Sequence, residues 1–238
     1  MKTIKDANNK RIKKDDVLKH LENGEMAMAE KDWTGNSRAY IATSGFANAS
    51  THERQSEDYY ATDPHAVEML LDFGIPFSNV WENAVGGWHL ANVLQDRHIL
   101  GKASDIVVRR SDEQEVNKDS IQTQIIDFLA YKNRGGWNGD IITNPPYKYA
   151  KEWAINSLDA ITDGHHVALF LPIRYLEGKA RRKELFDVNP PKYVFVSTSR
   201  IKAAMNGNFD EVKSSAVTYT WMVWQKGYNG ITELRWFN

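Results

Sequence analysis

From Tyr59 to the C-terminus, short apolar segments alternate with segments whose apolar residues recur at helical spacing. This alternation predicts strands connected by helices, which is typical of a parallel, doubly wound α/β sheet with helices on both faces. The expected strands lie at residues 79–82, 99–108, 121–129, 140–143, 167–171, 193–197 and 217–224. The expected helices lie at residues 64–73, 88–97, 150–161 and 176–186. We therefore expect one α/β domain over residues 59–238.

Residues 1–58 have a different character, because they are polar and contain several turn signals. They predict an irregular N-terminal arm. A short helix is expected at residues 15–22, where Val17, Leu18 and Leu21 form one apolar stripe. Residues 48–58 are almost wholly polar. Two interpretations of that segment stay open, a loop over a substrate groove and a disordered leader.

The composition excludes several classes of function. The chain has 238 residues and no Cys, which rules out disulfides, thiolate zinc sites and a cysteine nucleophile, and fits a cytoplasmic protein. No apolar stretch approaches the roughly 18 residues of a membrane span, and no His, Asp or Glu spacing indicates a metal site. The net charge is −1, so any contact with nucleic acid must come from local basic patches.

Polar features follow several of the predicted strands at the ends where ligands bind in doubly wound sheets. Glu82 precedes the turn Gly86-Gly87, and Asp127-Phe128 ends the third predicted strand. A glycine turn that opens a helix lets backbone N–H groups approach a ligand closely. Acidic side chains at such positions suit a ligand with a ribose and an amino group. The pattern therefore predicts a site for a nucleoside-type cofactor.

The segment Asn144-Pro145-Pro146-Tyr147 directly follows a short apolar strand. The two prolines fix φ and remove two backbone donors, which makes the loop stiff and turns its carbonyls outward. The Asn144 amide and a neighbouring carbonyl can hold a planar amino group by two hydrogen bonds, while Tyr147 stacks on the attached ring. Such a site positions the amine for attack on an electrophilic methyl group. The structural alternative is a rigid strand-to-helix turn with a capping Asn.

With these residues the chain resembles the S-adenosylmethionine (SAM)-dependent N6-adenine DNA methyltransferases, especially the compact enzymes encoded by phages and prophages. The resemblance extends from about Tyr59 to the C-terminus and implies a Rossmann-like methyltransferase sheet. Besides the Asn-Pro-Pro-Tyr segment, the motifs that carry it are residues 60–64, 80–86, 104–105, 126–129, 170–172, 176–178 and 221–224.

The resemblance implies SAM as the cofactor and a role for each matching residue. The implied SAM contacts are Thr62 and Pro64 near the methionine end, Glu82, Ala84 and Gly86 under the methionine moiety, Asp105 at the ribose hydroxyls, and Asp127 and Phe128 at the adenine ring. The implied catalytic residues are Asn144, Pro145, Pro146 and Tyr147. They would hold a target adenine that has left the duplex, because the stacked base is inaccessible.

The glycine turn departs from the family pattern. Asn83, Val85 and Trp88 stand at positions where the family often has Pro, Cys and a second Gly. A Trp at that position is expected to bring a bulky ring to a turn that passes close to SAM. Gly87 offers one way to absorb the change; otherwise the affinity for SAM falls.

Basic residues form two candidate DNA contacts in the predicted domain. Lys179, Arg181 and Arg182 cluster in one segment, for which a solvated helix face is the alternative interpretation. An excursion at about residues 198–215 is the second candidate, and its DNA-binding candidates are Arg200, Lys202 and Asn206. Arg54 in the N-terminal arm is a further candidate.

The sequence thus predicts a cytoplasmic, adenine-specific DNA methyltransferase that acts as a monomer or homodimer, without a metal or a membrane. Two alternatives use the same tetrapeptide on another amine, an RNA adenine or a protein glutamine amide. A third alternative is a DNA-binding module that has lost catalysis through the altered glycine turn.

Overall fold

The computed structural model describes residues 3–5, 11–13, 60–109, 121–199, 201, 203–205 and 217–237. The chain divides into two units, Met1–Tyr40 and Ile41–Asn238. In the first unit, β1 (Thr3–Lys5) pairs with β2 (Arg11–Lys13) in antiparallel register, within the segment for which the sequence predicts an irregular arm. The helix expected at residues 15–22 and the polar segment 48–58 lie outside the described residues.

The described residues of the second unit form an eight-stranded sheet with the order β12-β9-β11-β8-β7-β4-β5-β6. Its strands are β4 (Val80–Glu82), β5 (Leu100–Asp105), β6 (Thr123–Ile125), β7 (Ile141–Thr143), β8 (His166–Pro172), β9 (Tyr193–Ser197), β11 (Tyr219–Gln225) and β12 (Glu233–Phe237). Strand β11 is antiparallel to both of its neighbours, and the other pairs are parallel.

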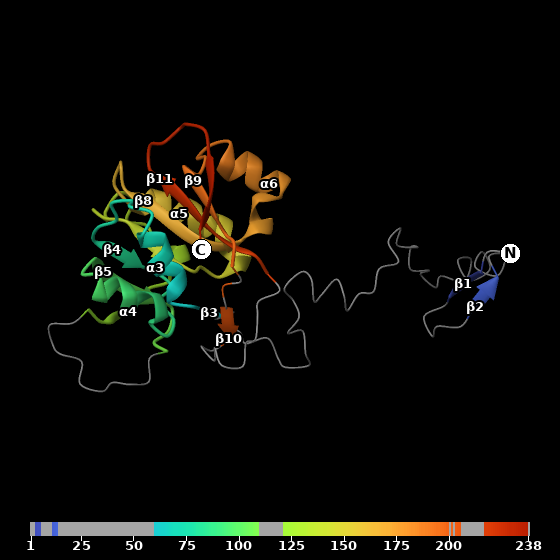
Figure 1. Ribbon diagram of the computed structural model, residues 1–238, viewed down its shortest axis with the longest axis horizontal. Helices are drawn as coiled ribbons and strands as arrows, with labels where there is room; N and C mark the ends of the chain where they lie inside the picture. The colour runs from blue at the N-terminus through green and yellow to red at the C-terminus, as the bar shows by residue number, and fades with distance from the viewer. Residues whose placement is uncertain are drawn as a thin grey trace. The chain divides into compact units, whose positions relative to one another are not determined.

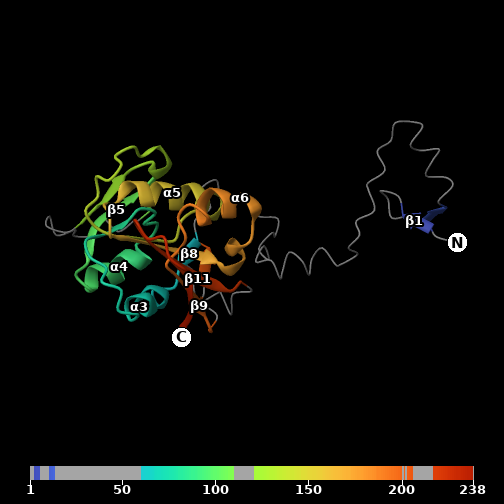
Figure 2. The same ribbon diagram turned by 90° about the horizontal axis from the view of Figure 1, so that it is seen from above.

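Helices cover both faces of this sheet, as Figures 1 and 2 show. They are α3 (His65–Leu71) and α4 (His89–Asp96) on one face and α5 (Ala150–Ala160) with α6 (Lys179–Arg181) on the other. Short turns complete the layers, namely η1 (Phe128–Ala130), η2 (Tyr147–Tyr149), η3 (Ile173–Leu176) and the π-helical η4 (Arg182–Phe186). The expected α/β, Rossmann-like fold class is confirmed.

Successive side chains of the central strands point alternately to the two faces of the sheet, and this produces an apolar layer on each face. In β8, Leu169 and Leu171 pack in the core on the α5 side, whereas Ala168 and Phe170 pack in the core on the α3 side. All four are fully buried. Successive side chains of a strand point to opposite faces, so a strand buried on both sides reads as a continuous apolar run.

The strand order reverses beside β4. The chain passes from β4 outward through β5 and β6 and then returns to place β7 on the other side of β4. In such sheets this reversal leaves a crevice at the carboxyl ends of the two central strands. Here β4 ends at Glu82 and β7 ends at Thr143, immediately before Asn144.

Asp140 fixes the relative positions of three central strands at the opposite edge. Its Oδ2 accepts from the Ser78 backbone N–H at 2.6 Å, and its Oδ1 accepts from the His166 backbone N–H at 2.6 Å. Its backbone carbonyl accepts from the Trp81 N–H at 2.8 Å. The residue is 1% exposed. One carboxyl group therefore joins the beginnings of β4, β7 and β8.

A separate two-stranded sheet joins β3 (Tyr60–Thr62) to β10 (Ala203–Met205) in antiparallel register. Ala203 lies opposite Thr62. Strand β10 belongs to the excursion expected at residues 198–215. Residues 203–205 of the excursion therefore lie beside β3, next to Thr62.

Two predicted elements are wrong in extent. The strand expected at residues 121–129 covers only β6, because the Asp127 carboxylate accepts from the Leu129 and Ala130 N–H groups and caps η1. The helix expected at residues 176–186 is broken into η3, α6 and η4. Gly178, at φ +134°, adopts a conformation outside any helix and separates η3 from α6.

Trp88 is a core residue. Its side chain is 2% exposed, packs with Val85, Ala91 and Ala103, and donates from Nε1 to Thr123 Oγ1 at 2.7 Å. Its backbone has φ 70°, in the left-handed region that favours glycine. The turn therefore keeps the backbone conformation of a glycine while the ring is buried beneath β5.

We expect Trp88→Gly to destabilise the fold. Loss of a buried aromatic ring costs about 3–5 kcal/mol, whereas relief of the left-handed backbone returns only about 1–2 kcal/mol. Urea denaturation should therefore show a lower free energy of unfolding for Trp88→Gly than for the wild type. His98→Gly is the matched control, because His98 also has positive φ but is exposed. It should leave stability unchanged or slightly raised; a gain of stability in Trp88→Gly would contradict the core assignment.

Candidate active site

A cavity of about 340 Å³ lies at the reversal point of the sheet. Its wall is built from the carboxyl ends of β4, β5 and β7, together with β3 and η1. The sequence-predicted residues that line it are Thr62, Glu82, Ala84, Asp105, Asp127, Phe128, Asn144, Pro145, Pro146 and Tyr147. The structure therefore brings both groups of predicted residues into one cavity, of a size that small-molecule sites commonly have.

The Asn144-Pro145-Pro146-Tyr147 segment connects β7 to α5 through η2. Pro145 is buried, while Asn144 and Tyr147 are half-buried. The Tyr147 ring lies 6.2 Å from the Tyr219 ring, which stacks on Phe170 at 4.8 Å. The aromatic side chains behind Tyr147 fix one side of the ring, and the rigid proline turn fixes its backbone.

Glu82 lies in the cavity wall and is 2% exposed. Its Oε1 accepts from Thr143 Oγ1 and, at 3.3 Å, from the Ala84 N–H. Burial raises the pKa of Glu82 to about 8, although these hydrogen bonds act in the opposite direction. Glu82 is therefore mostly protonated at neutral pH in the ligand-free protein.

Asp105 ends β5, and its carboxylate is already engaged. Oδ2 accepts from the Gly86 N–H at 2.8 Å, while Oδ1 accepts from the Ile106 N–H at 2.7 Å and from Arg109 Nη1 at 2.9 Å. Arg109 also lines the cavity, and sequence reasoning missed it. A ligand hydroxyl at this position would share the carboxylate with Arg109 or displace the guanidinium.

Asp127 and Phe128 form an apolar wall with a polar edge. Phe128 is 1% exposed and lies 5.3 Å from Trp81 and 5.0 Å from Trp153, measured between ring centroids. Trp153, which also lines the cavity, comes from α5. A flat ring against Phe128 would thus meet a surface that its own aromatic neighbours hold in place.

Polar atoms without partners cluster in the cavity wall. Among the described residues, Thr62 Oγ1, Glu82 Oε2 and Asn83 Nδ2 are buried and have no hydrogen-bond partner. All three residues line the cavity. Each such atom costs about 1–3 kcal/mol when it is left unsatisfied. Three such atoms at one wall make the wall suited to a polar ligand that could supply hydrogen-bond partners.

Two of the predicted cofactor residues do not line the cavity. Pro64 is the N-cap residue of α3, and Gly86 is buried with φ 51°, where its N–H holds Asp105. Trp88, the bulky residue expected at the glycine turn, also lies outside the lining and packs in the core instead. The physical reason is that its left-handed backbone directs the ring into the core beneath β5.

Sequence reasoning missed several lining residues besides Arg109. They are Ala61, Asn83, Val85, Leu90, Ile106, Ile126, Leu129, Lys148, Tyr149 and Trp153, and His89 beside the glycine turn lines the cavity too. Several are direct neighbours of motif residues, which was the available signal. Burial lowers the pKa of His89, so this half-buried side chain is less readily charged than a free histidine.

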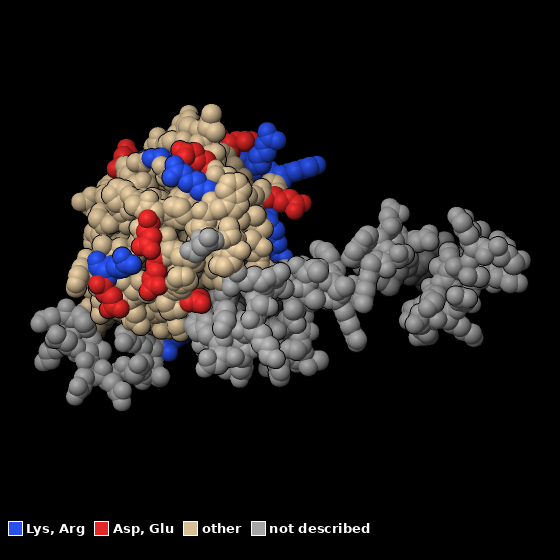
Figure 3. All heavy atoms as spheres, viewed as in Figure 1, with Lys and Arg blue, Asp and Glu red and all other residues tan. Residues whose placement is uncertain are grey.

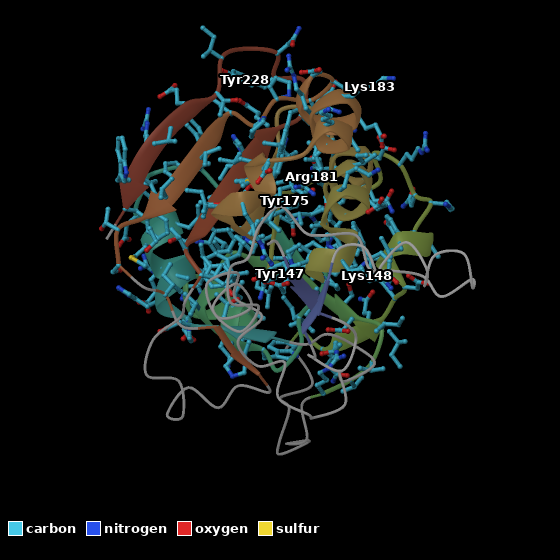
Figure 4. The ribbon with its side chains drawn as sticks, turned by 90° about the vertical axis from the view of Figure 1, so that its right-hand side faces the viewer. Tyr147, Lys148, Tyr175, Arg181, Lys183 and Tyr228 are labelled. Carbon is cyan, nitrogen blue, oxygen red and sulfur yellow. The ribbon has the colours of Figure 1, made fainter. Side chains whose placement is uncertain are left out.

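The predicted DNA contacts have different structural settings. Lys179 and Arg182 are exposed on α6 and η4, on the side where Figure 3 shows Lys and Arg gathered. Arg181 lies 4.6 Å above the Tyr175 ring and donates from Nε to the Tyr175 carbonyl at 2.8 Å. In Figure 4 this pair is seen above Tyr147 and Lys148. Arg181 thus stabilises the η3–α6 turn.

The remaining predicted contacts, Arg54, Arg200, Lys202 and Asn206, lie outside the described residues. In the part of the chain that is described, no helix is long and apolar enough to cross a bilayer. Within the same ranges, no group of three or more His, Asp or Glu side chains is placed to hold a metal ion.

No protein-family model and no curated protein matches the sequence. A predicted O-methyltransferase from Agrobacterium tumefaciens is 13% identical with a TM-score of 0.49, over 66% of this chain and 77% of that one. A SAM-dependent O-methyltransferase from Thermotoga maritima is 12% identical with a TM-score of 0.46, over 80% and 73%. A tRNA (m1A58) methyltransferase from Aquifex aeolicus is 15% identical with a TM-score of 0.43, over 75% and 74%. At TM-scores below 0.5 these similarities carry no argument about activity.

We expect Glu82→Gln to remove a pH dependence of stability. The pKa of Glu82 in the folded protein is raised to about 8 from 4.5, so its contribution to stability is lost as pH rises from about 4.5 to 8. Urea denaturation at pH 5 and pH 9 should show a smaller difference in Glu82→Gln than in the wild type, by roughly 2–4 kcal/mol. Glu152→Gln, on exposed α5 surface, should retain the wild-type difference. Equal differences in all three proteins would contradict the assignment.

Proposed function

We propose that this protein transfers the methyl group of SAM to N6 of a flipped-out adenine in DNA. One observation carries the proposal. The Asn144-Pro145-Pro146-Tyr147 segment at the end of β7 lines the same cavity as Glu82, Asp105 and Phe128, which follow or end the neighbouring strands. A rigid amine-binding turn thus opens into a cavity with the polar and apolar walls of a nucleoside site.

The chemistry of the cavity fits SAM in two respects. Thr62, Glu82 and Asn83 offer buried polar atoms that lack partners among the described residues, and SAM carries a carboxylate, an ammonium group and ribose oxygens. Phe128 and Leu129 offer an apolar wall for the adenine ring. When bound, SAM supplies a methyl group on a positively charged sulfur. Glu82 in its ionised form is the negative group that favours this charge.

The catalytic turn acts by positioning. The Asn144 side-chain oxygen and the Pro145 carbonyl accept the two N–H groups of the target amine, which directs the nitrogen lone pair toward the methyl group. Tyr147 stacks on the target ring and is itself supported by Tyr219. Holding the two reacting atoms in this arrangement supplies most of the rate enhancement.

The surface around the tetrapeptide fits a nucleic-acid substrate. Lys148 and Tyr149 line the cavity and are exposed, and the exposed side chains of Ile173 and Leu176 follow the next strand, β8. Exposed Lys179 and Arg182 offer phosphate contacts farther along this segment. An enzyme that flips a base needs an aromatic pocket for that base, apolar side chains that replace its stacking neighbours in the duplex, and cationic side chains that bind the phosphate backbone.

The decisive experiment measures transfer of a labelled methyl group from SAM to DNA isolated from a methylation-free strain. RNA and a glutamine-containing protein extract serve as parallel acceptors. Label on N6 of adenine in DNA alone is the expected result. Label only on RNA or on protein would show that the protein is a methyltransferase with a substrate other than DNA. No transfer, together with no binding of SAM, would contradict the proposal.

Asn144→Ala should abolish methyl transfer, since it removes the amide that holds the target amine. We expect at least a hundredfold loss of turnover with an unchanged melting temperature and SAM affinity, because Asn144 is only half-buried. Asn92→Ala is the matched control, since Asn92 is exposed on α4 away from the cavity. Near wild-type turnover in Asn144→Ala would show that the catalytic assignment is wrong.

SAM affinity should rise with pH through the titration of Glu82. Its pKa of about 8 means that a cationic ligand displaces a proton below that pH, so the affinity should increase between pH 6 and 8 and level off above. Calorimetry of SAM and of the uncharged thioether S-adenosylhomocysteine separates the sulfonium effect from titration of the ligand's own amine. Glu82→Gln should remove the difference between the pH profiles of affinity for the two ligands. An unaltered difference would show that Glu82 is not the titrating group.

A further inference from the structure

We propose that Asn83 is a cofactor-binding residue whose side-chain N–H donates to the adenosine half of SAM. The inference rests on the proposed function and adds a specific contact to it. Asn83 directly follows β4, is 1% exposed, and lines the cavity. It was not among the residues expected from the sequence to bind the cofactor.

The orientation of the Asn83 amide follows from its neighbour on α5. Trp153 Nε1 lies 2.9 Å from Asn83 Oδ1 in a buried hydrogen bond. An indole N–H can only donate, so the amide must present its oxygen to Trp153. This contact therefore decides which amide atom is the oxygen and which is the nitrogen.

The Asn83 nitrogen therefore needs an acceptor that the protein does not supply. Nδ2 is buried and has no hydrogen-bond partner among the described residues. A buried amide that satisfies its oxygen and leaves its nitrogen unpaired is uncommon in folded proteins, and each such group calls for an explanation. Since Asn83 lines the cavity, a ligand acceptor there gives that explanation.

The neighbours of Asn83 indicate which half of the ligand supplies the acceptor. Trp153, its hydrogen-bond partner, lies 5.0 Å from the Phe128 ring, on the wall proposed for the adenine ring. Glu82, the preceding residue, bonds instead to Thr143 on β7. The two consecutive residues thus serve different parts of the cavity. An adenosine bound against this wall would offer ribose oxygens and adenine ring nitrogens as acceptors for the Asn83 amide.

The test compares two ligands by calorimetry. SAM contains both halves, whereas 5′-methylthioadenosine lacks the amino-acid half. Asn83→Ala should weaken both ligands by the same factor, roughly tenfold for one buried hydrogen bond. Asn92→Ala should bind both as the wild type does. Thr62→Val, at the methionine end, should weaken SAM while leaving 5′-methylthioadenosine unchanged.

The outcomes separate this inference from the proposed function. If the wild type binds neither ligand, both fail. If the wild type binds SAM and Asn83→Ala binds it equally well, the inference is overturned while the proposed function stands. A loss confined to SAM would assign the Asn83 donor to the amino-acid half and overturn the adenosine contact.

Trp153→Phe provides a second variant should Asn83→Ala fail to fold. It keeps an aromatic ring and removes only the N–H that orients the amide, so both ligands should weaken by a smaller factor. In the double variant, the loss of ligand affinity caused by Trp153→Phe should not add to the loss caused by Asn83→Ala, because the two residues act as one unit. Wild-type affinity in Trp153→Phe, or full additivity, would overturn the role of this hydrogen bond.

Discussion

The buried Asp140 carboxylate is the interaction on which the arrangement of the sheet depends. It accepts from backbone N–H groups at the beginnings of β4 and β8, and Asp140 itself precedes β7. A slip of one residue between these strands would exchange their two apolar faces. By fixing their beginnings, Asp140 also fixes where they end. Glu82 and Asn144 can therefore meet in one cavity although they are far apart in the sequence.

The cavity wall gathers several buried polar atoms that lack partners. The central strands bury apolar side chains on both faces, whereas the wall at their carboxyl ends buries the partnerless polar atoms of Thr62, Glu82 and Asn83. Such groups oppose folding, and Glu82 responds by a raised pKa. They are tolerable because they are few and lie beside a large apolar core. A ligand that forms hydrogen bonds with these groups removes their unfavourable contribution to folding. Ligand binding should therefore stabilise the folded protein.

The sequence predicts features that depend on local pattern and misses those that depend on distant contacts. Alternating apolar segments predict the central strands, and the proline pair identifies the loop after β7. Strand β12 escapes prediction because four of its five residues are exposed at the edge of the sheet. The roles of Asn83 and Arg109 escape for another reason. Each depends on a partner, Trp153 or Asp105, that only the folded chain places beside it.

Trp88 shows why a departure from a motif need not alter the site that the motif serves. A glycine in such a turn provides a left-handed backbone, and Trp88 adopts the same conformation at φ 70°. The added ring then goes to the core with Val85 and Ala103, where its N–H finds Thr123. The neighbouring Gly86 N–H still reaches Asp105. The turn thus requires a left-handed backbone at this position but not the absence of a side chain. Burial of the Trp88 ring offsets the strain of its left-handed backbone.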